Sequence, residues 1–236
     1  MRLDKFLCKS TALCKQEAIQ SIHAKDVTVN GVVVTDASTQ VHENNTVLLN
    51  GERLKARDFR YILMHKPAGT VCSNVDEVYP SLFRYLNVDK VSELHIVGRL
   101  DVDTTGLVLV TDDGRWSFDI TRPSNGCQKV YRVQLSRPMS SESAQVVADT
   151  FLKGVLLQGE AKLTLPATME QIAPHEVRLT ITEGRFHQVK RMFAAVGNRV
   201  VSLHREQIGN LRLDVVTEQW RYLTLKEVES FRNHSN

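Results

Sequence analysis

The sequence lacks the features that would direct a protein into a membrane or an oxidising compartment. No stretch approaches the roughly 18 consecutive apolar residues that a membrane-spanning helix requires. The N-terminus, MRLDKFLCKS, carries charges where a signal peptide needs an apolar block. Only 4 cysteines are present and none forms a CxxC pair, so we expect reduced thiols rather than disulfides or a zinc site. These absences favour a cytoplasmic protein that does not bind membranes.

The chain is also poor in the patterns that hold common cofactors. Its 12 glycines form no glycine-rich phosphate-binding loop, and no set of acidic or histidine residues has metal-ligand spacing. We therefore expect neither a cofactor nor a metal. What remains is ordinary globular composition, with 236 residues, 42% of them hydrophobic and 24% charged. This length suffices for one large domain or for a small domain and a larger one.

Positive charge is concentrated in two places, although the net charge is only +3. A solvated surface would explain a single basic cluster, but two clusters far apart in the sequence favour a nucleic-acid partner. The first cluster comprises Arg2, Lys5, Lys9 and Lys15, and the second comprises Arg185, Lys190, Arg191, Arg199, Arg205 and Arg212.

Residues 1–57 have the pattern of a separate small module. Two groups of apolar residues at helical spacing predict two short helices, and two Asn-Gly dipeptides among β-branched residues predict hairpin turns. The helical groups are Leu3, Phe6 and Leu7, then Ala18, Ile19 and Ile22; the dipeptides begin at Asn30 and Asn50. Two basic helices followed by short strands resemble the α-L RNA-binding module of a small-subunit ribosomal protein and of many RNA-modifying enzymes.

Residues 60–231 predict a second domain dominated by strands, including YILMHK, GLVLVT, KVYRVQL, EVRLTIT and VVSLH. VKRMFAAVGN is the clearest helix, because Val189, Met192, Phe193 and Val196 share one face and Gly197 is a stop signal. Thr224 and Glu227 form a capping-box pattern for a last helix. The predicted fold class is mixed α/β (α+β), with a large, mostly antiparallel sheet flanked by helices.

The stretch GRLDVDTTGLVLVTDDG, residues 98–114, places two carboxylates beside an arginine before an apolar run. It partly matches a calcium-binding loop running from Asp101 to Asp112, but LVLV predicts a strand where the exiting helix should begin. DVDTT also matches the DxDxT signature of aspartyl-phosphate phosphatases. That chemistry needs the aspartates directly after a buried strand and further acidic magnesium ligands downstream, and the sequence offers neither.

The same stretch read as GRLDxxTTG resembles the central motif of the pseudouridine synthases. The resemblance implies that Asp101, which follows Gly-Arg-Leu, is the catalytic carboxylate and that Asp103 is a structural group. A plainer alternative is an exposed ion pair between Arg99 and Asp101, which would contribute little. Other motifs decide between them.

Three further segments resemble motifs of this family. HKPAGTVCS resembles the segment that opens the catalytic domain. In CQKVYRVQL, Tyr131 occupies the position of the tyrosine that stacks on the target base, although a strand tyrosine is more often a core residue. In EGRFHQVKRM, Lys190 occupies the position of the basic residue that pairs with the catalytic aspartate, although a basic outer helix face is the plainer alternative.

Taken together, the motifs imply an isomerase that converts a uridine of ribosomal RNA to pseudouridine, with 16S rRNA preferred to 23S rRNA as the substrate. Asp101 could attack the ribose, attack the uracil or remove a ribose proton. We expect a monomer that acts on naked rRNA or on an assembling small-subunit particle. A non-catalytic RNA-binding or ribosome-assembly factor is the alternative from another class. The residues expected to contact RNA are Arg2, Lys5, Lys9, Lys15, Arg99, Arg185, His187, Gln188, Arg191 and Arg205.

Overall fold

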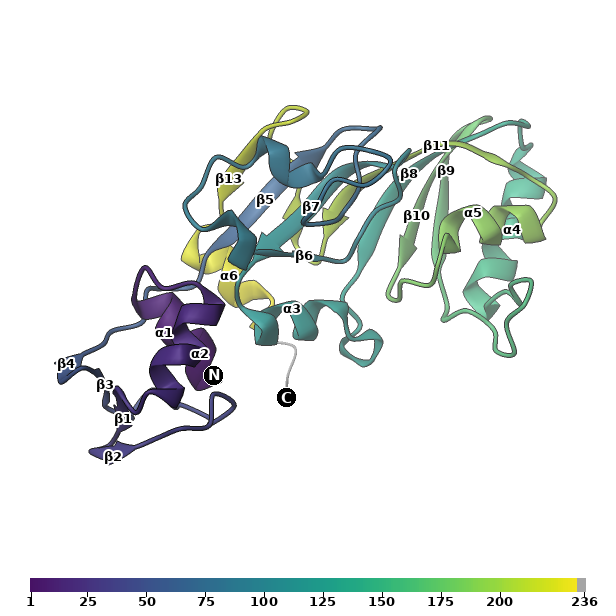
Figure 1. Ribbon diagram of the computed structural model, residues 1–236. Coiled ribbons are helices and arrows are strands. Elements are labelled where there is room, and N and C mark those ends of the chain that lie inside the picture. The colour runs from purple at the N-terminus through teal and green to yellow at the C-terminus, as the bar shows by residue number, and fades with distance from the viewer. Residues whose placement is uncertain (233–236) are drawn as a thin grey trace. The chain divides into compact units, whose positions relative to one another are not determined.

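The chain folds into two compact units, Met1–Asp58 and a larger unit that begins at Phe59 (Figure 1). The computed structural model describes residues 1–232. Within that range no helix is both long and apolar enough to cross a membrane.

The N-terminal unit contains the two helices and the hairpins that its sequence predicts. Helices α1 (Leu3–Ser10) and α2 (Lys15–His23) precede a four-stranded antiparallel sheet of order β2-β1-β3-β4. Asn30-Gly31 and Asn50-Gly51 make the hairpin turns, and all four residues have positive φ, as a type I′ turn requires. The strands are β1 (Val27–Val29), β2 (Val32–Val33), β3 (Val47–Leu49) and β4 (Glu52–Arg53).

The larger unit is built on one nine-stranded mixed sheet of order β13-β5-β7-β11-β8-β10-β9, with β6 paired to β7 and β12 to β11. Every pairing is antiparallel except that of β7 with β11. The predicted fold class is thereby confirmed. The strands are β5 (Tyr61–Lys66), β6 (His95–Val97), β7 (Thr105–Thr111), β8 (Lys129–Leu135), β9 (Thr168–Ala173), β10 (Glu176–Ile181), β11 (Val200–Ile208), β12 (Leu211–Arg212) and β13 (Trp220–Tyr222).

The central strand β7 contributes to hydrophobic cores on both faces of the sheet. Strand β7 is apolar from Leu107 to Val110 because both of its faces are covered: Val108 and Val110 join one hydrophobic core, whereas Leu107 and Leu109 join another. Phe151 and Phe193 pack edge to face at 5.2 Å in the first core. The helices are α3 (Gly114–Thr121), α4 (Ser141–Lys153), α5 (Gln188–Ala195) and α6 (Leu225–Ser230), with 3-10 turns at Leu82–Tyr85, Val91–Glu93 and Pro123–Asn125.

The two helix predictions in this unit are confirmed. Helix α5 buries Val189, Met192 and Phe193, and Gly197, with φ of 78°, follows its end. Helix α6 begins with the capping box predicted for Thr224 and Glu227. These local patterns were sufficient because each helix buries one stripe of its own surface.

Candidate active site

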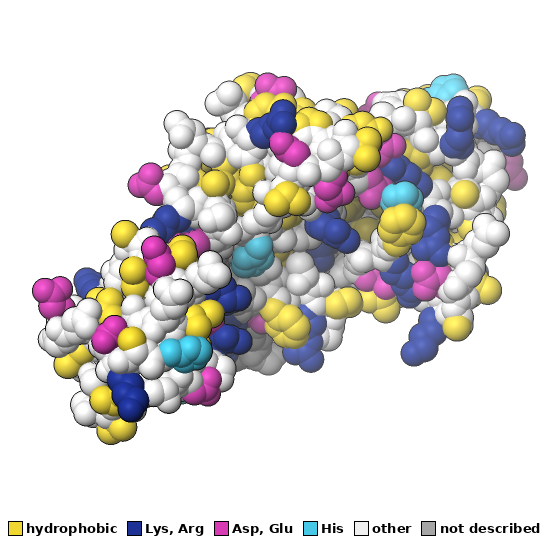
Figure 2. All heavy atoms as spheres, viewed as in Figure 1, with side chains coloured by type: hydrophobic (Ala, Val, Ile, Leu, Met, Phe, Trp, Pro, Cys, Tyr) yellow, Lys and Arg dark blue, Asp and Glu magenta, His cyan; other side chains and the backbone are white. Residues whose placement is uncertain are grey.

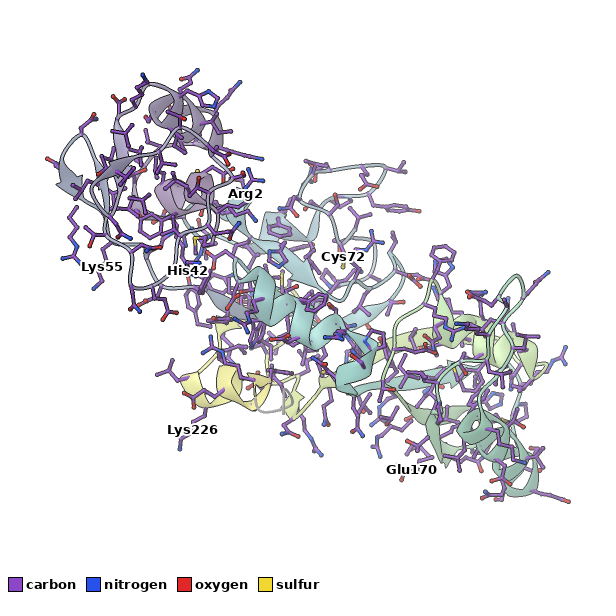
Figure 3. The ribbon with its side chains drawn as sticks, turned by 90° about the horizontal axis from the view of Figure 1, so that it is seen from below. Arg2, His42, Lys55, Cys72, Glu170 and Lys226 are labelled. Atoms are coloured by element: carbon purple, nitrogen blue, oxygen red, sulfur yellow. The ribbon has the colours of Figure 1, made fainter. Side chains whose placement is uncertain are left out.

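The first part of the acidic stretch, residues 98–104, forms the loop between the antiparallel strands β6 and β7. Asp101 lies half-buried in this loop, where its carbonyl oxygen accepts a hydrogen bond from the Thr104 N–H at 3.1 Å. Cys72, labelled in Figure 3, accepts a hydrogen bond through Sγ from the Leu100 N–H at 3.3 Å. The loop is therefore fixed on both sides of Asp101.

This placement contradicts the two alternative interpretations of the acidic stretch. The whole of β7 separates Asp101 from Asp112, and Asp112 pairs with Arg60 at 3.0 Å, so the two carboxylates cannot converge on one calcium ion. Strand β6 ends at Val97, four positions before Asp101, rather than directly before an aspartate pair as phosphatase chemistry needs.

Lys66 also supports this loop, a role that the HKPAGTVCS motif does not predict. Its side chain is fully buried, and Nζ donates to the carbonyl oxygens of Pro67 at 3.0 Å, Val102 at 3.2 Å and Thr104 at 2.9 Å. Burial lowers the pKa of this ammonium group. A signal for this burial was available, because strand alternation places Lys66 on the same face as Ile62 and Met64, both in the core.

Arg205 was expected to contact RNA, and the structure corrects this. The residue is only 2% exposed. Its guanidinium donates to the carbonyl oxygens of Gly98 and Leu107, both at 2.7 Å, and lies 3.4 Å from the Tyr131 hydroxyl. Arg205 therefore connects the start of the β6–β7 loop with β7 and with Tyr131, and it does not face solvent.

Lys9 and Gln188, which are also expected to contact RNA, have exposed fractions of only 7% and 4%. The Gln188 amide instead donates to Glu183 Oε1 at 2.9 Å and accepts the Arg185 N–H at 2.8 Å, which shapes the turn before α5.

A pocket of about 100 Å³ brings the three expected catalytic residues together. Asp101 comes from the β6–β7 loop, Tyr131 from β8 and Lys190 from α5, and all three line the pocket. Leu100, Val189 and Leu203 add apolar walls. Tyr131 is only 7% exposed, so its ring lies between core and pocket.

Lys190 lies between two carboxylates. Its Nζ donates to Asp101 Oδ2 at 3.0 Å and to Asp103 Oδ1 at 2.7 Å. Partial burial alone would lower the pKa of Lys190, but the hydrogen bonds to Asp103 and Asp101 outweigh it and raise the pKa. The hydrogen bond from Lys190 likewise lowers the pKa of Asp103. The lysine is thus held as a cation next to Asp101.

The two aspartates differ in position although they share this cation. The Asp101 side chain is 30% exposed and lines the pocket, whereas that of Asp103 is 72% exposed and points outside it. His187 Nε2 lies 3.5 Å from Asp101 Oδ1, on the side away from Lys190 Nζ, which contacts Oδ2. Asp101 is therefore the carboxylate that a molecule in the pocket would meet.

The other residues expected to contact RNA lie at the surface, and they differ in whether their charged groups already have partners within the protein. Figure 2 shows Lys and Arg side chains gathered around α5. Arg185 and Arg191 are both partly committed, since they donate to the carbonyl oxygens of Lys162, Leu163 and Gln158. In contrast, Lys5, Lys15 and Arg99 are exposed, whereas Arg2 is paired with Asp4 at 2.9 Å.

A larger groove of about 480 Å³ lies elsewhere on the sheet, lined in part by Arg132, Arg178 and Glu206. Both arginines pair with Glu206, and each also pairs with a second glutamate, Arg132 with Glu176 and Arg178 with Glu170. In the part of the chain that the structure describes, no group of His, Cys, Asp and Glu is arranged to hold a metal ion.

Comparison with known proteins identifies the family of this chain from matches that cover nearly all of its length. The family model for RNA pseudouridylate synthase matches residues 60–195, and the model for the S4 domain matches residues 1–47. Ribosomal small subunit pseudouridine synthase A of Vibrio cholerae is 47% identical over 98% of this chain and 99% of its own length. The protein of that name from Yersinia pestis is 45% identical over 98% of this chain and 97% of its own. A crystal structure of a pseudouridylate synthase superimposes with a TM-score of 0.69 at 41% identity, covering 98% and 99% of the two chains.

Proposed function

Because this chain belongs to the RNA pseudouridylate synthase family, and is thus an isomerase with an N-terminal S4 domain, we propose that it converts one uridine of 16S rRNA to pseudouridine. The relatives named for the small ribosomal subunit support 16S rRNA as the substrate. The observation that carries the proposal is the contact of Lys190 with Asp101 at 3.0 Å in a pocket that Tyr131 also lines.

In the proposed reaction, the bond between ribose C1′ and uracil N1 breaks, the base rotates, and C1′ bonds to uracil C5. The proton on C5 leaves and N1 gains one, so no group and no electron enters from outside. Asp101 acts as the catalytic carboxylate, by attack on the ribose, by attack on the uracil or by removal of a ribose proton. In each of these roles the Asp101 carboxylate acts beside the Lys190 ammonium, which donates to Oδ2 at 3.0 Å.

Tyr131 is the proposed surface for the target base. A uridine inside an RNA helix must leave its stack to reach Asp101, at a cost of a few kcal/mol. Stacking on an aromatic ring returns about 1–3 kcal/mol of that cost. The Arg205 guanidinium fixes the position of Tyr131, since it lies 5.9 Å from the ring centre and 3.4 Å from the hydroxyl.

The N-terminal S4 unit is proposed to hold the RNA rather than to take part in the chemistry. It carries the exposed Lys5 and Lys15 on its helices, and contacts of lysine with phosphates supply affinity that falls steeply with salt. We further propose that the enzyme acts as a monomer in the cytoplasm. Its substrate is naked 16S rRNA or an assembling small-subunit particle. Gel filtration of the free enzyme tests the monomer.

The decisive experiment is primer extension after carbodiimide treatment, which marks pseudouridine as a stop. Transcripts of 16S and 23S rRNA are incubated with the wild type, Asp101→Asn or Asp103→Asn. We expect one new stop in 16S rRNA that Asp101→Asn abolishes and that Asp103→Asn retains, because only Asp101 lines the pocket. Activity of Asp101→Asn would overturn the catalytic assignment.

The same experiment separates the alternatives. A stop in 23S rRNA instead would keep the reaction and reject the substrate. If neither naked transcript is modified, the assay is repeated on partly assembled small-subunit particles. Absence of a stop there as well would favour a non-catalytic RNA-binding factor.

A further inference from the structure

Phe186 is the most exposed aromatic residue among residues 1–232. Its exposed fraction is 76%, against 57% for Phe118, 51% for Tyr222 and 46% for Tyr79. The side chain contributes nothing to any hydrophobic core of the described residues. A single exposed phenyl ring is common at protein surfaces, so its orientation and its position decide whether it binds a partner.

The ring is held in a fixed orientation. It stacks on the imidazole of His187, with 3.8 Å between the ring centres and 20° between the planes. The backbone is anchored on both sides, because the Phe186 carbonyl oxygen accepts from Arg191 at 3.0 Å and the Arg185 N–H donates to Gln188 at 2.8 Å. The exposed aromatic surface is therefore preorganised, and binding to it loses little conformational entropy.

The stacked pair of His187 and Phe186 connects the catalytic pocket with the solvent-exposed surface. His187 lines that pocket, and its Nε2 lies 3.5 Å from Asp101 Oδ1. His187 has a φ of 48°, in the left-handed region that a non-glycine residue enters only when its surroundings impose it. With one face covered by His187, which lines the pocket, the Phe186 ring keeps its other face exposed to solvent.

The surroundings of Phe186 favour a base over an apolar protein surface. Cationic and polar groups adjoin Phe186, since Arg191 donates to its carbonyl oxygen and the imidazole of His187 stacks on its ring. Flat π surfaces with cationic neighbours are how proteins bind single-stranded bases.

We propose that the outer face of Phe186 stacks on the base of the nucleotide next to the target uridine. This inference rests on the proposed function. When the uridine leaves its stack and enters the pocket, its neighbour loses one stacking partner, and Phe186 replaces that partner at the entrance. Every base has a π face, so this contact stabilises the extruded state without reading the identity of the neighbour.

The first test is kinetic and uses the full chain with 16S rRNA. We expect Phe186→Ala and Phe186→Leu to raise KM about tenfold with little change in kcat, and Phe186→Trp to restore KM. Phe118→Ala is the matched control, since it removes another exposed phenyl ring, on α3 and outside the pocket, and should leave KM unchanged. Equal KM values for Phe186→Ala and Phe118→Ala would overturn the inference, as would a wild-type KM for Phe186→Leu.

The second test locates the stacked base. An RNA fragment containing the mapped uridine carries 2-aminopurine on its 5′ or 3′ side, and is bound to the Asp101→Asn variant so that no turnover occurs. We expect fluorescence quenching at one of these positions that is lost when Phe186→Ala is added and kept with Phe118→Ala. If Phe186→Ala leaves the fluorescence quenching unchanged at both positions, the proposal is overturned. If the wild type forms no pseudouridine in this RNA, the proposed function fails and this inference fails with it.

Discussion

Lys190 Nζ lies 3.0 Å from Asp101 Oδ2, although 89 positions separate the two residues in the chain. The contact joins the β6–β7 loop to α5 and places a cation beside a carboxylate that is partly removed from water. The same ammonium also donates to Asp103, so one cation contacts both aspartates of the loop.

The first prediction is that Lys190→Met lowers kcat about 100-fold or more and leaves the affinity for RNA within about threefold. The reason is that Lys190 Nζ is engaged by Asp101 and Asp103, and is not free to bind a phosphate. Single-turnover kinetics and filter binding on the same RNA measure the two quantities, with Lys190→Arg as the charge-conserving control. Loss of affinity and turnover in equal proportion would contradict the assignment.

The second prediction concerns the buried ammonium of Lys66. Lys66→Met keeps the side-chain length but leaves three carbonyl oxygens without this donor. We expect a loss of about 1–3 kcal/mol in the free energy of unfolding and a lower kcat, because the loop that carries Asp101 loosens. Urea denaturation and turnover are measured beside Lys162→Met, an exposed lysine. Wild-type values for both quantities would show that the loop holds its shape without Lys66.

The third prediction concerns the close approach of β7 to β11. A Cβ on Gly106 would lie 2.3 Å from the Arg205 carbonyl oxygen, and Gly106 has a φ of 112°. Gly106→Ala should therefore destabilise the protein by more than about 4 kcal/mol and reduce its soluble yield. Gly114→Ala is the control, since a Cβ there meets nothing within 4 Å. Equal urea midpoints for the two variants would contradict this account.

The fourth prediction is a pH dependence of stability. Hydrogen bonds from Arg221 lower the pKa of Glu227 from 4.5 to about 2. The ion pair then contributes stability above about pH 4.5, and this contribution is lost as the pH falls towards 2. Glu227→Gln should be less stable than the wild type by about 1 kcal/mol at pH 7, since the pair is partly solvated. The difference should be mostly lost by pH 2 and should vanish below it, while Glu229→Gln serves as the control at each pH. A difference that persists unchanged at pH 2 would refute the role of the charge.

The fifth prediction concerns the N-terminal unit. Removal of residues 1–57 deletes one complete unit with its own core. We expect the KM for 16S rRNA to rise about tenfold or more, and the salt dependence of binding to become shallower, because fewer phosphates are contacted. The kcat at saturating RNA should change by less than about threefold. Unchanged affinity would refute the RNA-holding role.

Some of the catalytic unit could be predicted from the sequence because it depends on local patterns. The helical stripe of α5 and the apolar run of β7 each identify their own element. Arg205 and Lys66 could not be placed in this way, because a charged residue in a strand suggests a solvated position. Their burial depends on carbonyl oxygens from other segments, such as those of Gly98 and Thr104.

Strand alternation offered a partial signal for both residues. Lys66 follows Ile62 and Met64 at a spacing of two, and Arg205 follows Leu203 at the same spacing. Each charged residue thus follows a buried apolar residue on the same face of its strand. The acceptors that make this possible come from strands that pair only in the folded sheet, and no local pattern names them.

The pairing of β7 with β11 also determines when an active enzyme can exist during synthesis. Thr105 and His204 contact each other across 99 positions of chain. At the usual 5–20 residues per second, the ribosome needs about 5–20 s to make the second after the first. Asp101 and Tyr131 are synthesised well before Leu203, the last residue in the chain that lines the pocket. Interrupted translation before that point therefore yields a protein without a catalytic pocket.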